Sequence, residues 1–171
     1  MLADMANEDA AEPSKLEEAA PPPDVVVRGN ASGFLQEIVT GEHHLRADEP
    51  ESVGGTDMAP DPYDYLLAGL GACTSMTVGL FARKKKWPLE DVKVALRRSR
   101  IHASDCADCE TKEGMLDHID VEVSLTGDLT DAQRATLMGI AHKCPVHRTL
   151  KSEIKISVRP AEGKTSSAAT S

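Results

Sequence analysis

The chain has 171 residues, a net charge of −9 and an aromatic content of only 3%. This length predicts one domain, large enough to bury a hydrophobic core without the help of disulfide bonds. The acidic balance and the shortage of aromatic side chains argue against a nucleic-acid-binding protein, which needs basic surfaces and rings on which bases stack.

No segment has the roughly 18 consecutive apolar residues of a membrane-spanning helix. The first residues also lack the basic and apolar regions of a signal peptide. We therefore expect a cytoplasmic protein, without nucleic-acid or membrane partners, whose thiols are reduced at rest.

Both ends of the chain are polar. Residues 1–24 contain seven acids, one base and four of the ten prolines, and cannot bury enough apolar area to offset the entropy of ordering. We predict disordered tails at residues 1–24 and 160–171, around a domain at residues 25–159. The acidic tail is either a solvated extension or an interaction arm.

The domain begins with three short strands. Residues 25–27 are β-branched, residues 34–40 alternate between apolar and polar, and residues 43–47 follow a turn. A loop broken repeatedly by Pro and Gly comes next.

A long helix then starts after Asp61, which can cap it, with Pro62 at the first helical position. It runs to Lys86, and its apolar side chains recur every three or four residues, which predicts one buried face. Its three glycines each cost a helix roughly 1 kcal/mol, so we expect another backbone to pack closely against it. These glycines are Gly69, Gly71 and Gly79.

The rest of the domain predicts two strands, a helix and a last strand. Alternating segments occupy residues 92–103 and 116–125, and a helix that starts near residues 128–130 ends before Pro145. Alternation at residues 154–158 indicates the last strand. Strands clustered around two helices favour an α+β fold.

The four cysteines form two patterns. Cys73 lies on the buried face of the long helix and Cys144 lies at the end of the second helix, whereas Cys106 and Cys109 form a Cys-x-x-Cys motif in a loop. On the residues alone, Cys73 is either a small core side chain or a functional thiol.

Two segments carry a resemblance to a known family. Residues 61–74 are similar to the first-cysteine helix of the OsmC (osmotically inducible protein C) and organic hydroperoxide resistance family, and residues 142–147 resemble its second-cysteine segment. The loop at residues 48–55 is similar as well, and the likeness extends over residues 33–158.

The resemblance implies antiparallel sheets around a long central helix, in an intertwined homodimer with sites at the subunit interface. It also implies an antioxidant thiol peroxidase of the stress response, which requires no cofactor. Cys73 would attack a hydroperoxide and become a sulfenic acid, and Cys144 would condense with it to a disulfide that a dithiol then reduces. His147 and Arg148 are candidates for tuning Cys144.

A reactive thiol must be a thiolate, and Cys73 lies too far along its helix for the helix dipole to help. In the peroxidase branch of the family, an arginine from an N-terminal strand supplies the charge, held by a glutamate after the helix proline. Here Tyr63 stands at the glutamate position, with the acid one place later at Asp64. Arg28 and Arg46 are the candidate arginines.

The Cys-x-x-Cys motif has three interpretations. With His102 and the more distant His118, Cys106 and Cys109 would make a zinc site. Alternatively they form a redox dithiol, or they are ordinary loop residues.

We therefore expect a homodimeric, OsmC-like redox protein that reduces hydroperoxides, organic ones preferentially. The alternative is a non-peroxidase dimer that binds a small apolar ligand and holds zinc at Cys106 and Cys109. A third interpretation is a disulfide exchanger that acts on proteins.

Overall fold

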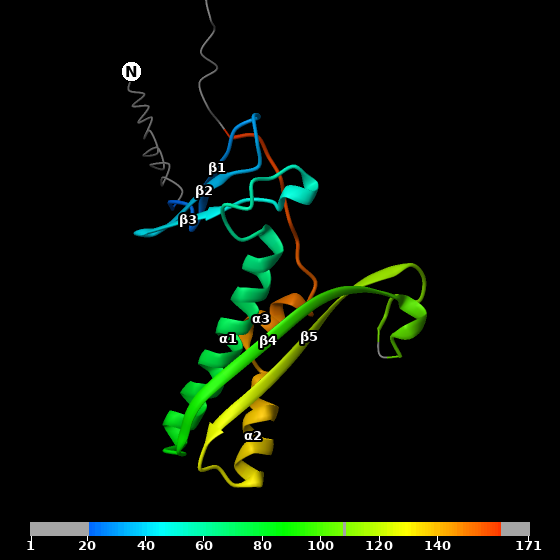
Figure 1. Ribbon diagram of the computed structural model, residues 1–171. Coiled ribbons are helices and arrows are strands. Elements are labelled where there is room, and N and C mark those ends of the chain that lie inside the picture. Colours follow the sequence, from blue (N-terminus) through cyan, green and yellow to red (C-terminus); the bar gives the residue numbers. More distant parts are fainter. Residues whose placement is uncertain (1–20, 108, 162–171) are drawn as a thin grey trace, which may run out of the picture. The chain divides into compact units, whose positions relative to one another are not determined.

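The computed structural model describes residues 21–107 and 109–161 (Figure 1). The chain divides into two compact units, Met1–Ala59 and Pro60–Ser171. Most of the two tails predicted at residues 1–24 and 160–171 lies outside the described residues.

The first unit is built on a three-stranded antiparallel sheet in the order β1-β2-β3. Its strands are β1 (Val26–Arg28), β2 (Gln36–Thr40) and β3 (His43–Ala47), so all three predicted strands are confirmed, although β2 begins later than expected. Gly41 has a φ of +56° in the tight turn between β2 and β3, a conformation that favours glycine.

The loop after β3 is organised by Asp48, which is only 2% exposed. One carboxylate oxygen accepts hydrogen bonds from the backbone N–H groups of Thr56 (3.1 Å) and Met58 (3.2 Å) and from the Thr56 hydroxyl (2.5 Å). The bond from the Thr56 hydroxyl, with those from backbone N–H groups, outweighs burial and lowers the pKa of Asp48 to about 2. This carboxylate holds together a loop that contains only the short 3₁₀ helix η1 (Glu51–Val53).

The second unit begins with the long helix α1 (Pro62–Lys85). Asp61 and Asp64 form a capping box in which each side chain accepts a hydrogen bond from the other residue's backbone N–H. Lys86 ends the helix in the left-handed conformation, with a φ of +55°. The predicted start and end of this helix are therefore confirmed.

Among the described helices, only α1 is long and apolar enough to cross a membrane, by length and composition alone. The core helix of a water-soluble protein passes the same test. Within this single chain, however, only 28% of its most apolar window is buried.

Strands β4 (Leu89–His102) and β5 (Met115–Gly127) form a long antiparallel hairpin that packs on α1 (Figure 1). Both strands begin earlier than predicted and β5 also ends later, whereas Ala103, the predicted last residue of β4, belongs to the short 3₁₀ helix η2 (Ala103–Asp105). A Cβ at Gly71 would lie 2.8 Å from the Leu96 side chain, so this glycine permits the close approach of helix and sheet. A Cβ at Gly69 would meet nothing within 4 Å, so the expected close neighbour is not found there in the described chain.

Helix α2 (Asp131–Ala141) completes the core of the second unit. Thr130 caps it in a second capping box, with Gln133. Arg134 donates to the carbonyl oxygens of Leu125 (2.7 Å) and Gly127 (2.9 Å) and so ties α2 to the end of β5. The buried core comprises Val78, Ala82, Leu129, Leu137 and Ala141.

The C-terminal part differs from the prediction in two ways. Pro145 does not simply end a helix, because it is the first residue of a further short helix, α3 (Pro145–Leu150). The strand predicted at residues 154–158 is absent from the described chain. Ile154, Ile156 and Val158 are 51%, 81% and 94% exposed, because no neighbouring strand pairs with this segment. Alternation creates an apolar face, but a strand also needs a hydrogen-bonding neighbour.

Candidate thiol site

The second unit brings Cys73 and Cys144 into contact. Cys73 lies in the middle of α1, and Cys144 is the N-cap residue of α3, which packs against α1. Both cysteines are free, and their side chains are hydrogen-bonded to each other. Cys73 is half-buried, whereas Cys144 is 0% exposed. A molecule from solvent therefore reaches the pair at Cys73.

The surroundings of Cys144 favour a negative charge. Burial raises the pKa of this thiol, but hydrogen bonds from Cys73, from the backbone N–H groups of His147 and Val146, and from Thr74 together lower it below the ordinary value. Pro145 sets this geometry, because it starts α3 directly after Cys144 and leaves the following N–H groups free to face the sulfur.

The surroundings of Cys73 act in the opposite direction. Burial raises its pKa, and the hydrogen bond to Cys144 and the charge of Cys144 raise it further, against weaker contributions from the Val146 N–H and the Thr77 hydroxyl. The Thr77 hydroxyl also donates to the Cys73 carbonyl oxygen at 2.7 Å. The first negative charge on the pair is therefore held at Cys144, with Cys73 as its hydrogen-bond donor.

His147 contributes to the site through its backbone. Its N–H faces Cys144, while burial, His142 and Lys151 lower the pKa of its imidazole below 6.5. The ring is therefore neutral at pH 7. It packs edge-on against His142, with ring centroids 6.0 Å apart.

Two cavities border this region. One of about 670 Å³ is rich in basic side chains and is lined by His142, Pro145, His147, Arg148, Thr149, Lys151 and Ser152. The other, of about 350 Å³, includes Leu70, one helical turn before Cys73, and is partly apolar. Its lining comprises Leu70, Asp117, His118, Ile119, Val121, His147, Leu150 and Lys151.

The start of α1 holds a charged cluster that sequence reasoning missed. The Arg98 guanidinium lies 3.6 Å from the centre of the Tyr63 ring and donates to Asp117 at 2.7 Å. The run of basic residues in β4 was the only feature of the sequence that pointed to this cluster. Asp64 is used in the capping box, so its carboxylate caps α1.

Arg28 and Arg46 belong to the first unit and share one sheet face. Each lies directly opposite Glu37, Arg28 on β1 and Arg46 on β3, and directly opposite residues of antiparallel strands project to the same side. This face therefore carries one acid between two arginines.

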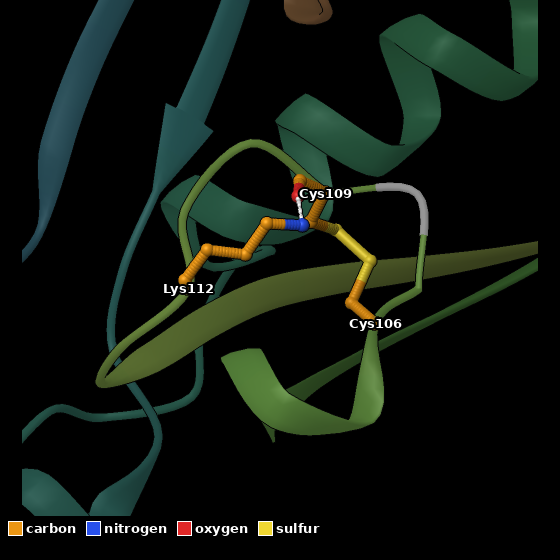
Figure 2. The surroundings of a disulfide bond; sticks show 3 residues. All are labelled: Cys106, Cys109 and Lys112. Atoms are coloured by element: carbon orange, nitrogen blue, oxygen red, sulfur yellow. Dashed lines mark hydrogen bonds between the residues drawn. A yellow bond between two sulfur atoms is a disulfide. The ribbon is translucent and has the colours of Figure 1, made fainter.

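Cys106 and Cys109 are joined in a disulfide, with their Cα atoms 5.5 Å apart (Figure 2). The expectation that the thiols are all reduced is therefore wrong for this pair. His102 is the last residue of β4, just before η2. Within residues 21–107 and 109–161, no three His, Cys, Asp or Glu side chains lie close enough to hold a metal ion. Zinc binding would require the disulfide to open, since thiolates are the zinc ligands.

The chain has the fold of several solved structures. It is similar to an organic hydroperoxide resistance protein from Elizabethkingia anophelis, with 17% identity, a TM-score of 0.57 and coverage of 81% of this chain and 94% of that one. It is also similar to an organic hydroperoxide resistance protein OsmC from Legionella pneumophila, with 24% identity, a TM-score of 0.54 and coverage of 74% and 87%. A third similar structure is the organic hydroperoxide resistance protein OhrB of Bacillus subtilis, with 20% identity, a TM-score of 0.51 and coverage of 74% of this chain and 88% of that one.

These likenesses establish the α+β fold, with antiparallel sheets and a long helix. No curated protein matches the chain. The family model described as OsmC-like protein matches residues 55–159, which is more than half of the chain and includes both cysteine segments. The chain therefore belongs to the OsmC-like protein family.

Proposed function

We propose that this protein is a cytoplasmic thiol peroxidase that reduces hydroperoxides through Cys73 and Cys144. The observation that carries the proposal is the contact between two free thiols of unequal exposure, Cys73 half-buried and Cys144 fully buried. Such a pair can form a disulfide after only one of its sulfurs has met a substrate. The printed names of several structural relatives refer to organic hydroperoxide resistance.

The electrostatics of the pair support a division of labour. Cys144 holds the thiolate and is hydrogen-bonded to the Cys73 thiol, so it can accept the Cys73 proton as Cys73 attacks the hydroperoxide. The O–O bond breaks, Cys73 keeps one oxygen as a sulfenic acid, and the leaving alkoxide takes the proton from Cys144 to become an alcohol.

Cys144, again a thiolate, then attacks the sulfur of the Cys73 sulfenic acid. A Cys73–Cys144 disulfide forms and hydroxide leaves. The two thiols have lost two electrons and the hydroperoxide has been reduced to an alcohol and hydroxide. A dithiol reductant restores the pair by thiol–disulfide exchange and is itself oxidised to a disulfide.

The partly apolar cavity that includes Leu70 supports a preference for organic hydroperoxides. The apolar tail of a substrate could be buried in this cavity, with a gain of roughly 25 cal/mol of free energy per Å² of apolar surface removed from water. The apolar side chains that line it are Leu70, Ile119, Val121 and Leu150. Hydrogen peroxide has no such tail and gains nothing from this surface.

A homodimer is part of the proposal. Several large apolar side chains of α1 are exposed in the single chain, and so is the alternating apolar segment after α3. A second copy would cover the helix face and provide a neighbour for the segment. The exposed side chains are Tyr63, Leu66, Met76 and Leu80 on α1, and Ile154, Ile156 and Val158 after α3.

The test is a single-turnover reaction of the reduced protein with one equivalent of cumene hydroperoxide or, in parallel, hydrogen peroxide. Peptide mapping after timed quenching locates any disulfide. We expect a Cys73–Cys144 disulfide that forms faster with cumene hydroperoxide and is absent in Cys73→Ser. The variant Cys106→Ser/Cys109→Ser is the matched control, because it removes two thiols away from the site. Persistence of both free thiols, Cys73 and Cys144, in Cys106→Ser/Cys109→Ser would refute the proposal.

One observation favours a second function, that of a dimer that binds a small apolar ligand without peroxidase activity. Burial raises the pKa of Cys73, which disfavours a nucleophilic thiolate, and a cavity of about 350 Å³ is lined by Leu70, one helical turn before Cys73. In that case the protein would bind an apolar probe such as cumyl alcohol while its thiols remain unreactive toward the hydroperoxide.

A further inference from the structure

The Cys106–Cys109 disulfide has no role in the peroxide reaction proposed above. It lies in the connection between β4 and β5, just after η2, and both cysteines are only partly buried (Figure 2). Its two sulfurs are therefore open to exchange with thiols from solvent, unlike the sulfur of Cys144.

The disulfide is far from the Cys73–Cys144 pair of its own chain. Arg98 of β4 lies against Tyr63 in the first turn of α1, and Cys73 lies ten residues further along that helix, roughly 15 Å away at 1.5 Å per residue. In the other direction, β4 continues past Arg98 for roughly 13 Å before η2 begins. Figure 1 shows this end of the hairpin extending away from α1. The two pairs cannot exchange directly within one chain.

The surroundings of the disulfide distinguish its two sulfurs. The Lys112 ammonium donates to the Cys109 carbonyl oxygen at 2.6 Å, which places a positive charge beside Cys109 (Figure 2). Both cysteines also have acidic neighbours in the sequence, Asp105 before Cys106 and Asp108 and Glu110 on either side of Cys109, so the Lys112 ammonium is what distinguishes the two positions. A neighbouring cation stabilises a thiolate, and exchange is faster when the leaving sulfur is the better stabilised one. The Lys112 ammonium therefore favours Cys109 as the leaving sulfur and Cys106 as the sulfur that a thiolate attacks.

We propose that Cys106–Cys109 is the port at which a dithiol protein delivers electrons to this enzyme. The reductant thiolate attacks Cys106, the Cys106–Cys109 bond breaks, and Cys109 leaves as a thiolate. The second thiol of the reductant then attacks the mixed disulfide, so that the reductant leaves as a disulfide and Cys106 and Cys109 are left reduced.

The reduced port passes its two electrons to a second copy of the chain. The Cys106 thiolate attacks Cys73 of an oxidised Cys73–Cys144 pair, Cys144 leaves as a thiolate, and Cys109 then resolves the mixed disulfide. This restores Cys106–Cys109 in one copy and two thiols in the other. This step rests on the proposed peroxidase function, because the hydroperoxide is what oxidises Cys73 and Cys144.

The test compares two reductants in continuous turnover with cumene hydroperoxide: dithiothreitol, which is small, and thioredoxin with its reductase and NADPH, a protein dithiol. In Cys106→Ser/Cys109→Ser, we expect the thioredoxin-driven rate to fall at least tenfold, while the dithiothreitol-driven rate changes less than twofold. Its single-turnover Cys73–Cys144 disulfide should form as in the wild type. An unchanged thioredoxin-driven rate would refute the proposal that a dithiol protein delivers electrons at Cys106–Cys109.

A mixing experiment tests transfer between copies. Cys73→Ser keeps the port but has no peroxide centre, and Cys106→Ser/Cys109→Ser keeps the centre but has no port. We expect the mixture to recover thioredoxin-driven turnover that neither variant shows alone, and a rate no higher than the sum of the two would overturn the transfer.

The proposed role of Cys106–Cys109 can be tested separately from the proposed peroxidase activity. Thiol titration of Cys73→Ser after exposure to reduced thioredoxin reports reduction of Cys106–Cys109 without any peroxide reaction. Lys112→Gln should slow that reduction severalfold, whereas Lys112→Arg, which keeps the charge, should not. Resistance of the disulfide to thioredoxin in Cys73→Ser would refute the port whatever happens at Cys73.

Discussion

The thiol of Cys73 is hydrogen-bonded to Cys144, yet the two side chains differ in both exposure and charge preference. Cys73 is the one that solvent reaches, and Cys144 is the one whose surroundings stabilise a thiolate. The sulfur that a substrate can reach and the sulfur that best holds a negative charge are thus two different atoms in contact. In the proposed mechanism, a proton that moves along the hydrogen bond between them converts the accessible thiol into the nucleophile.

Replacing Cys144 by serine should leave a sulfenic acid at Cys73, because no thiol remains to condense with it. We expect Cys144→Ser, treated with one equivalent of cumene hydroperoxide, to be labelled at Cys73 by dimedone, as detected by mass spectrometry. Its oxidation should also be at least tenfold slower than in the wild type, since the thiolate that accepts the Cys73 proton is gone. Cys73→Ser is the control and should give no label at Cys144. Equal oxidation rates in Cys144→Ser and the wild type would contradict the role of Cys144 as a base.

The interaction between Cys73 and Cys144 should separate the pH values at which the two thiols ionise. Because the pKa of Cys144 is lowered, its thiolate persists as pH falls below the ordinary thiol value of 9.0. In Cys106→Ser/Cys109→Ser, we expect thiolate absorbance to show a first ionisation below pH 9.0 and a second above it. Adding Cys73→Ala should move the first ionisation to higher pH, because the hydrogen bond from Cys73 is lost. A first midpoint that does not change would show that Cys73 contributes nothing to the thiolate.

His147 should make the fold less stable in mild acid. Its folded-state pKa lies below 6.5, so the unfolded chain binds the proton more readily and the free energy of unfolding decreases as pH falls from 7 through 6.5. We expect denaturant unfolding of His147→Gln to show a shallower decrease over this range. His44→Gln, a change at an exposed residue of β3, is the control and should keep the wild-type slope. Identical slopes for wild type and His147→Gln would refute the prediction.

Asp48 should stabilise the first unit only while it is ionised. Its folded-state pKa of about 2 lies below the ordinary value of 3.8, so its contribution is present above pH 3.8 and is lost as pH falls through 2. Asp48→Asn keeps the shape but weakens the hydrogen bonds from Thr56 and Met58. We expect a lower Tm for this variant at pH 7 and a smaller difference from the wild type near pH 2, measured by circular dichroism. Glu51→Gln, a change at an exposed side chain nearby, should leave Tm unchanged.

The local signals in the sequence were sufficient for α1. Asp61, Pro62 and Asp64 define its start by capping chemistry that acts within a few residues. The second N-terminal strand and both long strands followed from alternation, the first strand from its β-branched residues, and the third from its place after a turn. The meeting of Cys73 with Cys144 could be expected only through the family resemblance, because it depends on the packing of α3 against α1.

What the sequence could not reveal depends on neighbours distant in the chain. Pro145 suits either the end of one helix or the first turn of the next, and only the fold decides between them. The charge preference of Cys144 arises from hydrogen bonds from Cys73, from backbone N–H groups and from Thr74, and the spacing of the cysteines in the sequence does not encode these contacts. The position of Arg98 over Tyr63 likewise depends on the register of β4 along α1.

The exposed segment after α3 gives the sharpest test of the proposed homodimer. Ile156 is 81% exposed in the single chain, although the alternation at residues 154–158 is typical of a strand with one buried face. If a second copy covers it, Ile156→Lys places a charge in an apolar interface and should convert dimers to monomers in analytical ultracentrifugation. Val53→Lys, at a 58% exposed side chain of η1, is the matched control and should leave the sedimentation coefficient unchanged. A wild type that sediments as a monomer would contradict the dimer itself. An Ile156→Lys variant that stays dimeric would instead show that the contact between copies lies elsewhere, with the uncovered face of α1 as the next surface to alter.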